Sequence, residues 1–371
     1  MDGMQVIDWD LAVATGTRLV RPGPQVSREE ARHAVAELRR LSREAEGHVL
    51  EFTRIDTERA AARHDRRPAR LDPGERRGFR VVLEPLTERM AARKDQTPAI
   101  VSAVGSRITG VEVGAVLAFL ASRVLGQYEL FLPPDPSGQA PVGRLTLVAP
   151  NIVHAERELG VDPRDFRLWV CLHEETHRVQ FTGVPWLREY VRSQMTEFLL
   201  ASDLDLPTLL DRLRSAADAV ADVVRGGEGN LIDAIQTPEQ KEILDRLTAV
   251  MTLVEGHGDY VMDAVGPAVV PSVAQIRAQF QHRREGGSRL DRTVRKLLGI
   301  DLKMKQYAEG SAFVRTVVDR AGMDGFNKVW TSPETLPTQE EIARPELWIT
   351  RVISASALPG TVLPEADGTT G

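Results

Sequence analysis

The sequence is poor in cysteine: Cys171 is the only one among 371 residues. A disulfide bond within the chain is therefore excluded, and so is a zinc site built from several cysteines. A metal ion would have to be bound by histidine and carboxylate side chains. Cys171 itself lies in an apolar run, which predicts a core residue.

The chain also lacks a long apolar run, a basic leader and an excess of positive charge. Its most apolar stretch, residues 113–125, is too short to cross a bilayer. The N-terminus shows no basic segment followed by an apolar one, and the net charge of -6 disfavours binding to nucleic acid. We therefore expect a cytoplasmic protein without nucleic-acid or membrane partners. No feature of the sequence predicts an oligomeric state.

The elements that can be recognised predict a mainly helical fold. Ser27, followed by glutamates and a helical apolar pattern, is typical of a helix start. Another helix is predicted to begin at Asp162–Pro163 and to end near Gly183. Upstream of it, Tyr128–Leu132 and Leu145–Val148 are short β-prone runs that predict a small antiparallel pair.

The composition is that of one globular domain with a polar tail. Hydrophobic residues make up 42% of the chain and charged residues 27%. We expect a single domain over residues 1–356, with a helical N-terminal part to about residue 127. The part over about 128–330 carries the motifs described next. Residues 357–371 are predicted to be a disordered tail.

Residues 173–177 read HEETH and match the pattern H-E-x-x-H. On a helix, His173 and His177 share a face and can present two imidazoles to one ion. Glu174 lies about 100° around the helix axis. Zinc suits such a site because it leaves one position for water, whose pKa it lowers to about 7. Glu174 is then predicted to act as the general base that takes the proton from this water.

The pattern alone arises by chance in about one chain per hundred of this length, so a charged helix face with two incidental histidines is the alternative. The preceding turn, Leu168–Leu172, is strongly apolar. A helix buried at this point needs partners for its polar side chains. Metal binding supplies them, which favours the functional interpretation, with one zinc ion per chain.

The third ligand is predicted from the segment EGHGD, which begins at Glu255. Glu255 and Asp259 are four residues apart and share a helix face, whereas His257 points roughly the opposite way. This geometry predicts Glu255 as the ligand and Asp259 as the acceptor for the free N–H of a ligand histidine. His257 is the competing ligand; otherwise we expect it on the outer side or near the substrate opening. Gly256 and Gly258 indicate close packing, either with the H-E-x-x-H helix or through a local distortion.

Several segments together resemble a known family. They are HEETHRVQF with PWL after it, EGHGDYVMD, and the later KQYAEGSAFV, LPT and PELWITRV. These segments are similar to those of the zincin-like, gluzincin-type family of bacterial candidate hydrolases. Members are often labelled as associated with deazaflavin-cofactor biosynthesis, without a demonstrated reaction. The resemblance covers nearly the whole chain.

What the resemblance implies is a mostly helical zincin-like fold with zinc bound by His173, His177 and Glu255. It implies no known substrate. The chain departs from the usual gluzincin pattern because Glu255 lies 78 positions after His177, much farther than is common, which puts the shape of the substrate cleft in question.

Three functions remain open from the sequence. Leu145–Val148 precedes the motif helix, where a strand in zincins pairs with an extended peptide, and this favours a metallopeptidase acting on a peptide or other amide. Tyr260 and Tyr307 are candidate donors to the oxyanion. The alternatives are a catalytically idle zinc-stabilised scaffold that binds a partner, which an intact Glu174 disfavours, and a non-peptide amidohydrolase of cofactor metabolism.

Overall fold

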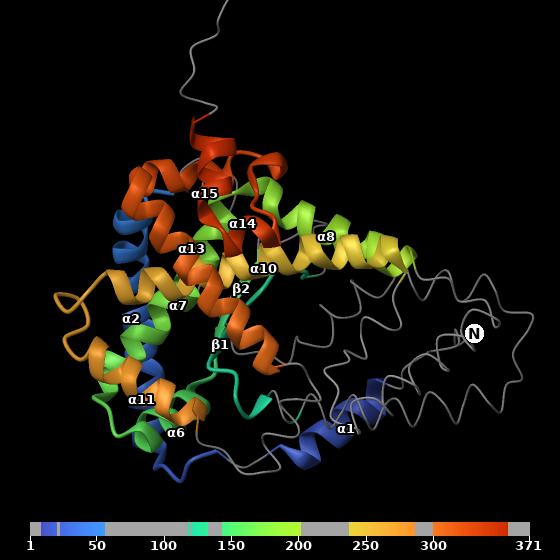
Figure 1. The fold of residues 1–371 in the computed structure, drawn as a ribbon. Helices are drawn as coiled ribbons and strands as arrows, with labels where there is room; N and C mark the ends of the chain where they lie inside the picture. Colours follow the sequence, from blue (N-terminus) through green and yellow to red (C-terminus); the bar gives the residue numbers. More distant parts are fainter. Residues whose placement is uncertain are drawn as a thin grey trace, which may run out of the picture.

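The computed structural model describes residues 9–20, 23–55, 118, 121–132, 143–201, 237–285 and 300–354. The helices within these ranges are α1 (Trp9–Leu19), α2 (Arg28–Thr53), α6 (Ala149–Leu159), α7 (Pro163–Gly183), α8 (Pro185–Leu200), α10 (Pro238–Ala264), α11 (Val273–Glu285), α13 (Ile300–Phe326), α14 (Gln339–Ala343) and α15 (Pro345–Trp348). The short 3-10 helices η1 (Asn327–Trp330) and η2 (Pro333–Thr335) and the π-helix η3 (Ile349–Ser354) complete the described C-terminal part. The predicted mainly helical fold is confirmed (Figure 1). The predicted tail, 357–371, lies outside the described residues.

The predicted antiparallel pair is also present. Strands β1 (Gly126–Glu129) and β2 (Arg144–Leu147) pair with Gly126 opposite Leu147. Both strands begin earlier in the chain than predicted, because apolar residues mark the buried positions of a strand and not the ends of its backbone pairing. The pair packs against α7.

Helix α7 begins where the sequence predicted. The side chain of Asp162 accepts a hydrogen bond from the backbone N–H of Asp165, and Pro163 occupies the first turn. At the start of α2, Ser27 and Glu30 exchange side-chain and backbone hydrogen bonds in a capping box. Both predicted helix starts are confirmed.

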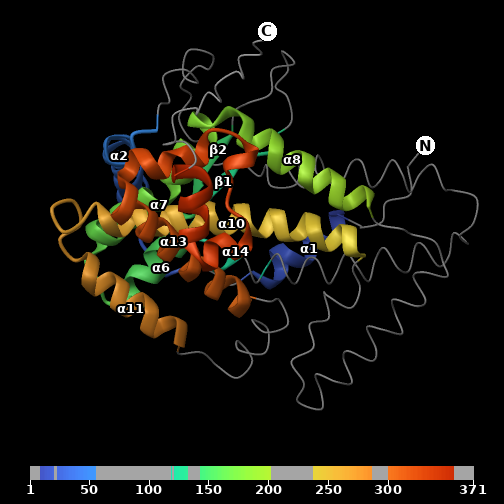
Figure 2. The ribbon, with the colours of Figure 1, turned by 45° about the horizontal axis from the view of Figure 1, so that its top comes forward.

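The core is built around α7 and α10. Helix α7 packs between α2 and α10, and α10 packs in turn against α13 (Figures 1 and 2). Several large side chains of α7 are almost inaccessible to solvent: Phe166, Leu168, Trp169 and Leu172. The apolar turn before the H-E-x-x-H motif therefore enters the core, as the sequence predicted.

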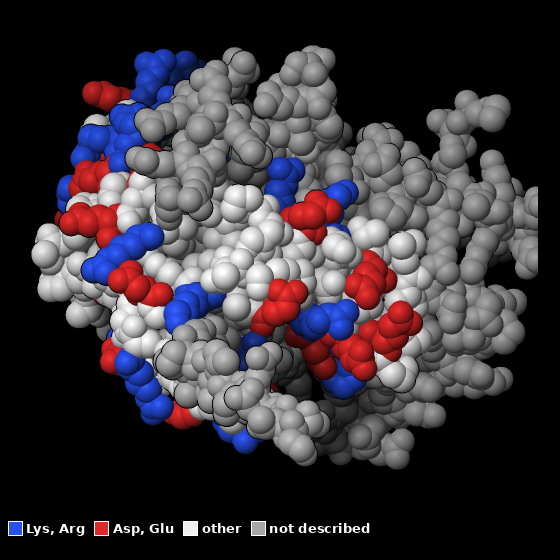
Figure 3. All heavy atoms as spheres, turned by 90° about the horizontal axis from the view of Figure 1, so that it is seen from above, with Lys and Arg blue, Asp and Glu red and all other residues white. Residues whose placement is uncertain are grey.

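Charge is mixed on the surface seen in Figure 3, where basic and acidic side chains lie near one another over the described residues and no broad basic patch is visible on that face. Within the described part of the chain, no helix has both the length and the apolarity that spanning a bilayer requires.

Close packing at Gly256 joins α10 to α13. A Cβ atom added to Gly256 would overlap the backbone of Gly310, and one added to Gly310 would overlap the carbonyl oxygen of Thr252. The two helix backbones are thus in direct contact. The sequence left open whether the two glycines of EGHGD pack against the H-E-x-x-H helix or mark a local distortion. In the structure Gly258 faces that helix, whereas Gly256 faces α13.

We expect Gly256→Ala to lower the free energy of unfolding by about 1–3 kcal/mol, because the added methyl group forces two helix backbones apart. The matched control is Gly47→Ala, an exposed position inside α2 where an added Cβ meets nothing within 4 Å. That change should stabilise the protein by about 0.5–1 kcal/mol, since glycine is the poorer helix former. Urea unfolding of both variants measures these changes. Equal changes in the free energy of unfolding would contradict the close contact between α10 and α13.

Candidate metal centre

Helices α7 and α10 run antiparallel and face each other along a row of polar contacts whose α7 residues are spaced about one helical turn apart. We call this row the polar seam. Its facing pairs are Gln180 with Val254, His177 with Glu255, His173 with Asp259, and Trp169 with Asp263. The spacing follows from the helix itself, because residues three or four apart share one face.

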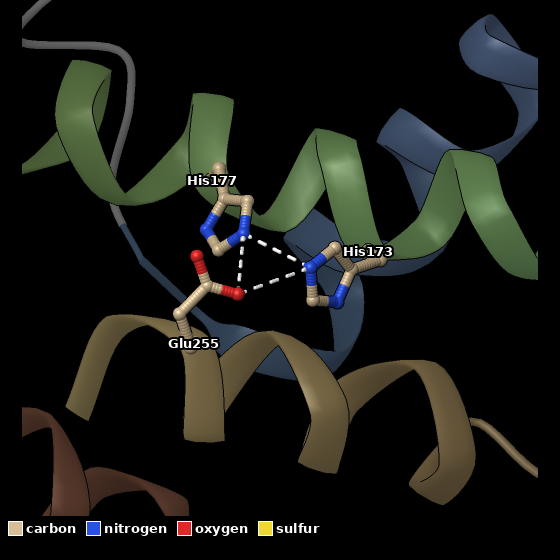
Figure 4. A group of neighbouring side chains, drawn as sticks. All are labelled: His173, His177 and Glu255. Carbon is tan, nitrogen blue, oxygen red and sulfur yellow. Dashed lines mark hydrogen bonds and ion pairs between the residues drawn. The ribbon is translucent and has the colours of Figure 1, made fainter. Parts of the chain in front are cut away.

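The structure brings the three predicted metal ligands together at the middle of the polar seam (Figure 4). Nε2 of His173 lies 3.5 Å and Nε2 of His177 lies 3.7 Å from the same carboxylate oxygen of Glu255. The two Nε2 atoms are 3.1 Å apart. All three ligand atoms lie within 4.8 Å of one another.

The electrostatics of this cluster favour a cation. Burial alone would lower the pKa of His173, but the hydrogen bond and negative charge of Glu255 outweigh it and raise this pKa to about 9. The same carboxylate raises the pKa of His177 against burial. The pKa of Glu255 is lowered despite its burial, because both imidazoles stabilise its charged form.

Two nitrogens and one carboxylate oxygen form the donor set of a catalytic zinc site. The three side chains keep 10–24% of their surface exposed, so a water molecule can reach their meeting point. The residues present therefore fit a zinc ion, and that they bind one stays a prediction.

Asp259 lies behind His173. Its Oδ1 is 3.7 Å from Nδ1 of His173, and this buried nitrogen has no hydrogen-bond partner among the described residues. The distance is slightly too long for a hydrogen bond. Asp259 thus faces one of the two histidines, and its role as the acceptor for the free N–H of a ligand histidine stays a prediction.

Glu174 lies one residue beyond His173 and faces the sheet. It is 6% exposed, and a Cβ atom added to Gly126 would lie 2.5 Å from its carboxyl carbon. The carboxylate is thus against the backbone of β1. Burial raises the pKa of Glu174, although the nearby imidazoles oppose the shift. A carboxylate with a raised pKa is a stronger proton acceptor.

His257 does not lie where the sequence placed it. We expected the outer side of the helix or the substrate opening, and this is wrong, because His257 is fully buried. Its Nδ1 is 2.9 Å from Nε2 of Gln180, and its ring packs on Phe326 and Trp330 at centroid distances of 5.0 and 5.7 Å. The face of α10 opposite Glu255 is covered by the C-terminal elements and is itself core. Burial, together with the charge of His177, lowers the pKa of His257 to about 3.

Tyr260, one of the two predicted oxyanion donors, is not among the three clustered side chains. The ring of Tyr260 packs on Phe52 of α2 at 6.0 Å, and the guanidinium of Arg315 lies 5.4 Å from its centroid. Tyr307 belongs to α13, and its side chain lies outside the described part of the chain. The role of both tyrosines stays a prediction.

Comparison with known protein families identifies the family of this chain. The model of the zincin-like metallopeptidase family matches residues 7–349, and the chain belongs to this family. The resemblance noted in the sequence is thereby confirmed.

Among solved structures, the chain is similar to a candidate hydrolase with a novel fold from Chloroflexus aurantiacus. The two share 30% sequence identity with a TM-score of 0.62, over 95% of this chain and 100% of the other. No curated protein matches the chain.

Proposed function

We propose that this protein is a zinc-dependent metallopeptidase. The observation that supports the proposal best is the convergence of His173, His177 and Glu255 from two antiparallel helices beside the buried Glu174. Membership of the zincin-like family supports the same class. In this proposal Glu174 is the catalytic base and the three clustered side chains hold one zinc ion.

When bound, zinc would supply a Lewis acid that polarises the scissile carbonyl group and lowers the pKa of a water molecule. The chain supplies the proton transfer. Glu174 takes a proton from the attacking water and delivers it to the leaving amine, with its pKa raised by burial toward the working pH. Contact with the backbone of Gly126 limits the positions of the carboxylate, and Asp259 orients His173.

The position of the sheet supports a peptide substrate. Backbone groups of an exposed strand can pair with an extended peptide, and β1 lies directly against Glu174 at Gly126. From the sequence, we predicted that the later run, Leu145–Val148, pairs with the peptide. In the structure β2 is the partner of β1, and Gly126 of β1 lies against Glu174.

We expect purified protein to contain about one zinc ion per chain, because one suitable ligand set is found among the described residues. Zinc at 100 times its Kd should raise the free energy of unfolding by about 2.7 kcal/mol. Elemental analysis and thermal unfolding measure both. His173→Ala should lose the metal, whereas His154→Ala, at an exposed position of α6, should keep it. Protein that neither contains nor takes up zinc would refute the proposal.

A peptide library tests the substrate class. Cleavage products that require both zinc and Glu174 support a metallopeptidase. Zinc-loaded protein that leaves every peptide intact but hydrolyses small-molecule amides is instead a non-peptide amidohydrolase. Zinc without either activity indicates the scaffold function.

A further inference from the structure

Gln180 is a fully buried residue of α7 whose side chain contacts three polar groups. Its Nε2 lies 3.0 Å from the carbonyl oxygen of Val254 and 2.9 Å from Nδ1 of His257. Its Oε1 lies 2.9 Å from Nδ1 of His177. All polar atoms of this side chain are therefore in hydrogen-bond contact with another residue.

The contact with Val254 fixes which way the amide points. A backbone carbonyl oxygen can only accept a hydrogen bond, so the group facing it must be the amide NH2. The reverse orientation would bring two oxygens together without a proton between them. The amide oxygen therefore faces His177, and this assignment follows from the hydrogen-bond partners.

The orientation of Gln180 determines the tautomer of His177. An amide oxygen can only accept, so Nδ1 of His177 must carry the proton. In a neutral imidazole the lone pair is then on Nε2, the atom that faces His173 and Glu255. We propose that Gln180, held by Val254 and His257, is a positioning residue that fixes His177 as the metal-binding tautomer. This inference rests on the proposed zinc site.

His257 completes the arrangement. The amide of Gln180 has two N–H groups and is buried, so the second one also needs an acceptor. Nδ1 of His257 supplies it, which requires the proton of this imidazole to be on Nε2. That atom is buried among aromatic rings and has no hydrogen-bond partner among the described residues. His257 therefore acts through Gln180 and not as a metal ligand.

The two ligand histidines are oriented by different chemical groups. His173 faces the carboxylate of Asp259, which is a charged acceptor, whereas His177 faces a neutral amide. A neutral amide oxygen does not take up the Nδ1 proton at ordinary pH. Nδ1 of His177 therefore stays protonated and the ring keeps one direction before any metal arrives, which reduces the cost of ordering the site on binding.

The tautomer can be measured without metal. In zinc-free protein, brought to an alkaline pH at which the imidazole signals no longer shift, a long-range 1H–15N correlation spectrum should show a protonated Nδ1 and an unprotonated Nε2 at His177. Gln180→Leu should give a mixture of tautomers and weaken zinc binding by about 10–100-fold. The control Gln194→Leu, a buried glutamine of α8 that bonds Arg246 and Glu197, should change neither property.

A second pair of variants tests His257. His257→Asn places an amide oxygen near the position of Nδ1 and should retain the wild-type tautomer at His177 and the zinc affinity. His257→Leu has a similar volume without an acceptor and should weaken zinc binding in the same direction as Gln180→Leu. Rescue by asparagine and not by leucine distinguishes a hydrogen-bonding role from simple packing.

Two results would overturn the inference. One is a protonated Nε2 at His177 in the wild-type protein, which needs no variant to fold. The other is a folded Gln180→Leu variant with unchanged tautomer and zinc affinity. If the wild-type protein binds no zinc at all, the proposed function fails, while the spectrum of His177 still decides the role of Gln180.

Discussion

Replacement of Glu174 with glutamine is expected to abolish hydrolysis while the protein keeps its zinc. The amide has nearly the same shape as the carboxylate and fits against β1, but it cannot take a proton from water. General-base catalysis contributes about 10²–10⁴-fold to the rate, so kcat should fall by that factor. The three ligand atoms are unchanged, and zinc content should equal that of the wild type.

The neighbouring residue provides a matched control. Glu175 is also buried, but it bonds Ser42 of α2 and Arg178 and faces away from the metal centre. Glu175→Gln should lower the stability of the α2–α7 contact and leave turnover per folded molecule near wild type. Loss of zinc from Glu174→Gln would show that Glu174 is a ligand and that the assigned roles are wrong.

Glu255→Ala should weaken zinc binding by orders of magnitude. The change removes a ligand outright and leaves two imidazoles without the carboxylate that raises their pKa values. The loss should exceed the roughly 10–100-fold effect expected when a supporting residue is removed. Competition with a chelator of known affinity measures it.

Glu242→Ala is the control for this experiment, since Glu242 is an exposed glutamate of the same helix. It should bind zinc like the wild type. The loss of zinc affinity should be largest in Glu255→Ala and smaller in His257→Leu, and Glu242→Ala should show none. Retained affinity in Glu255→Ala together with complete loss in His257→Leu would reverse the ligand assignment.

Helical periodicity was sufficient to predict which side chains meet. The four-residue spacing of His173 and His177, and that of Glu255 and Asp259, placed each pair on one helix face, and the structure brings these faces together. The helix starts were predictable for a similar reason, because capping depends on a few adjacent residues.

The environment of His257 could not be predicted in this way. Periodicity showed that it points away from Glu255, but not that the C-terminal elements cover that side of α10. Gln180 was overlooked because glutamine is an uncommon partner of a metal ligand and its contacts join residues far apart in the sequence. Its position three residues after His177, on the same helix face, was the signal that could have identified it.

Gly258 has a consequence for the alignment of the two helices. A slide of α10 by one turn, about 5.4 Å, would set Asp259 and Asp263 opposite the ligand histidines and again supply carboxylates. Such a slide would put Met262 at the position of Gly258. A slide in the other direction would put Val254 there and would leave one carboxylate, that of Glu255, opposite the histidines. Even a Cβ atom there would lie 3.0 Å from the ring of His173, so neither side chain fits. Gly258 therefore permits one alignment of α10 with α7 and excludes those shifted by a turn, as a buried polar residue fixes the alignment of helices in a coiled coil.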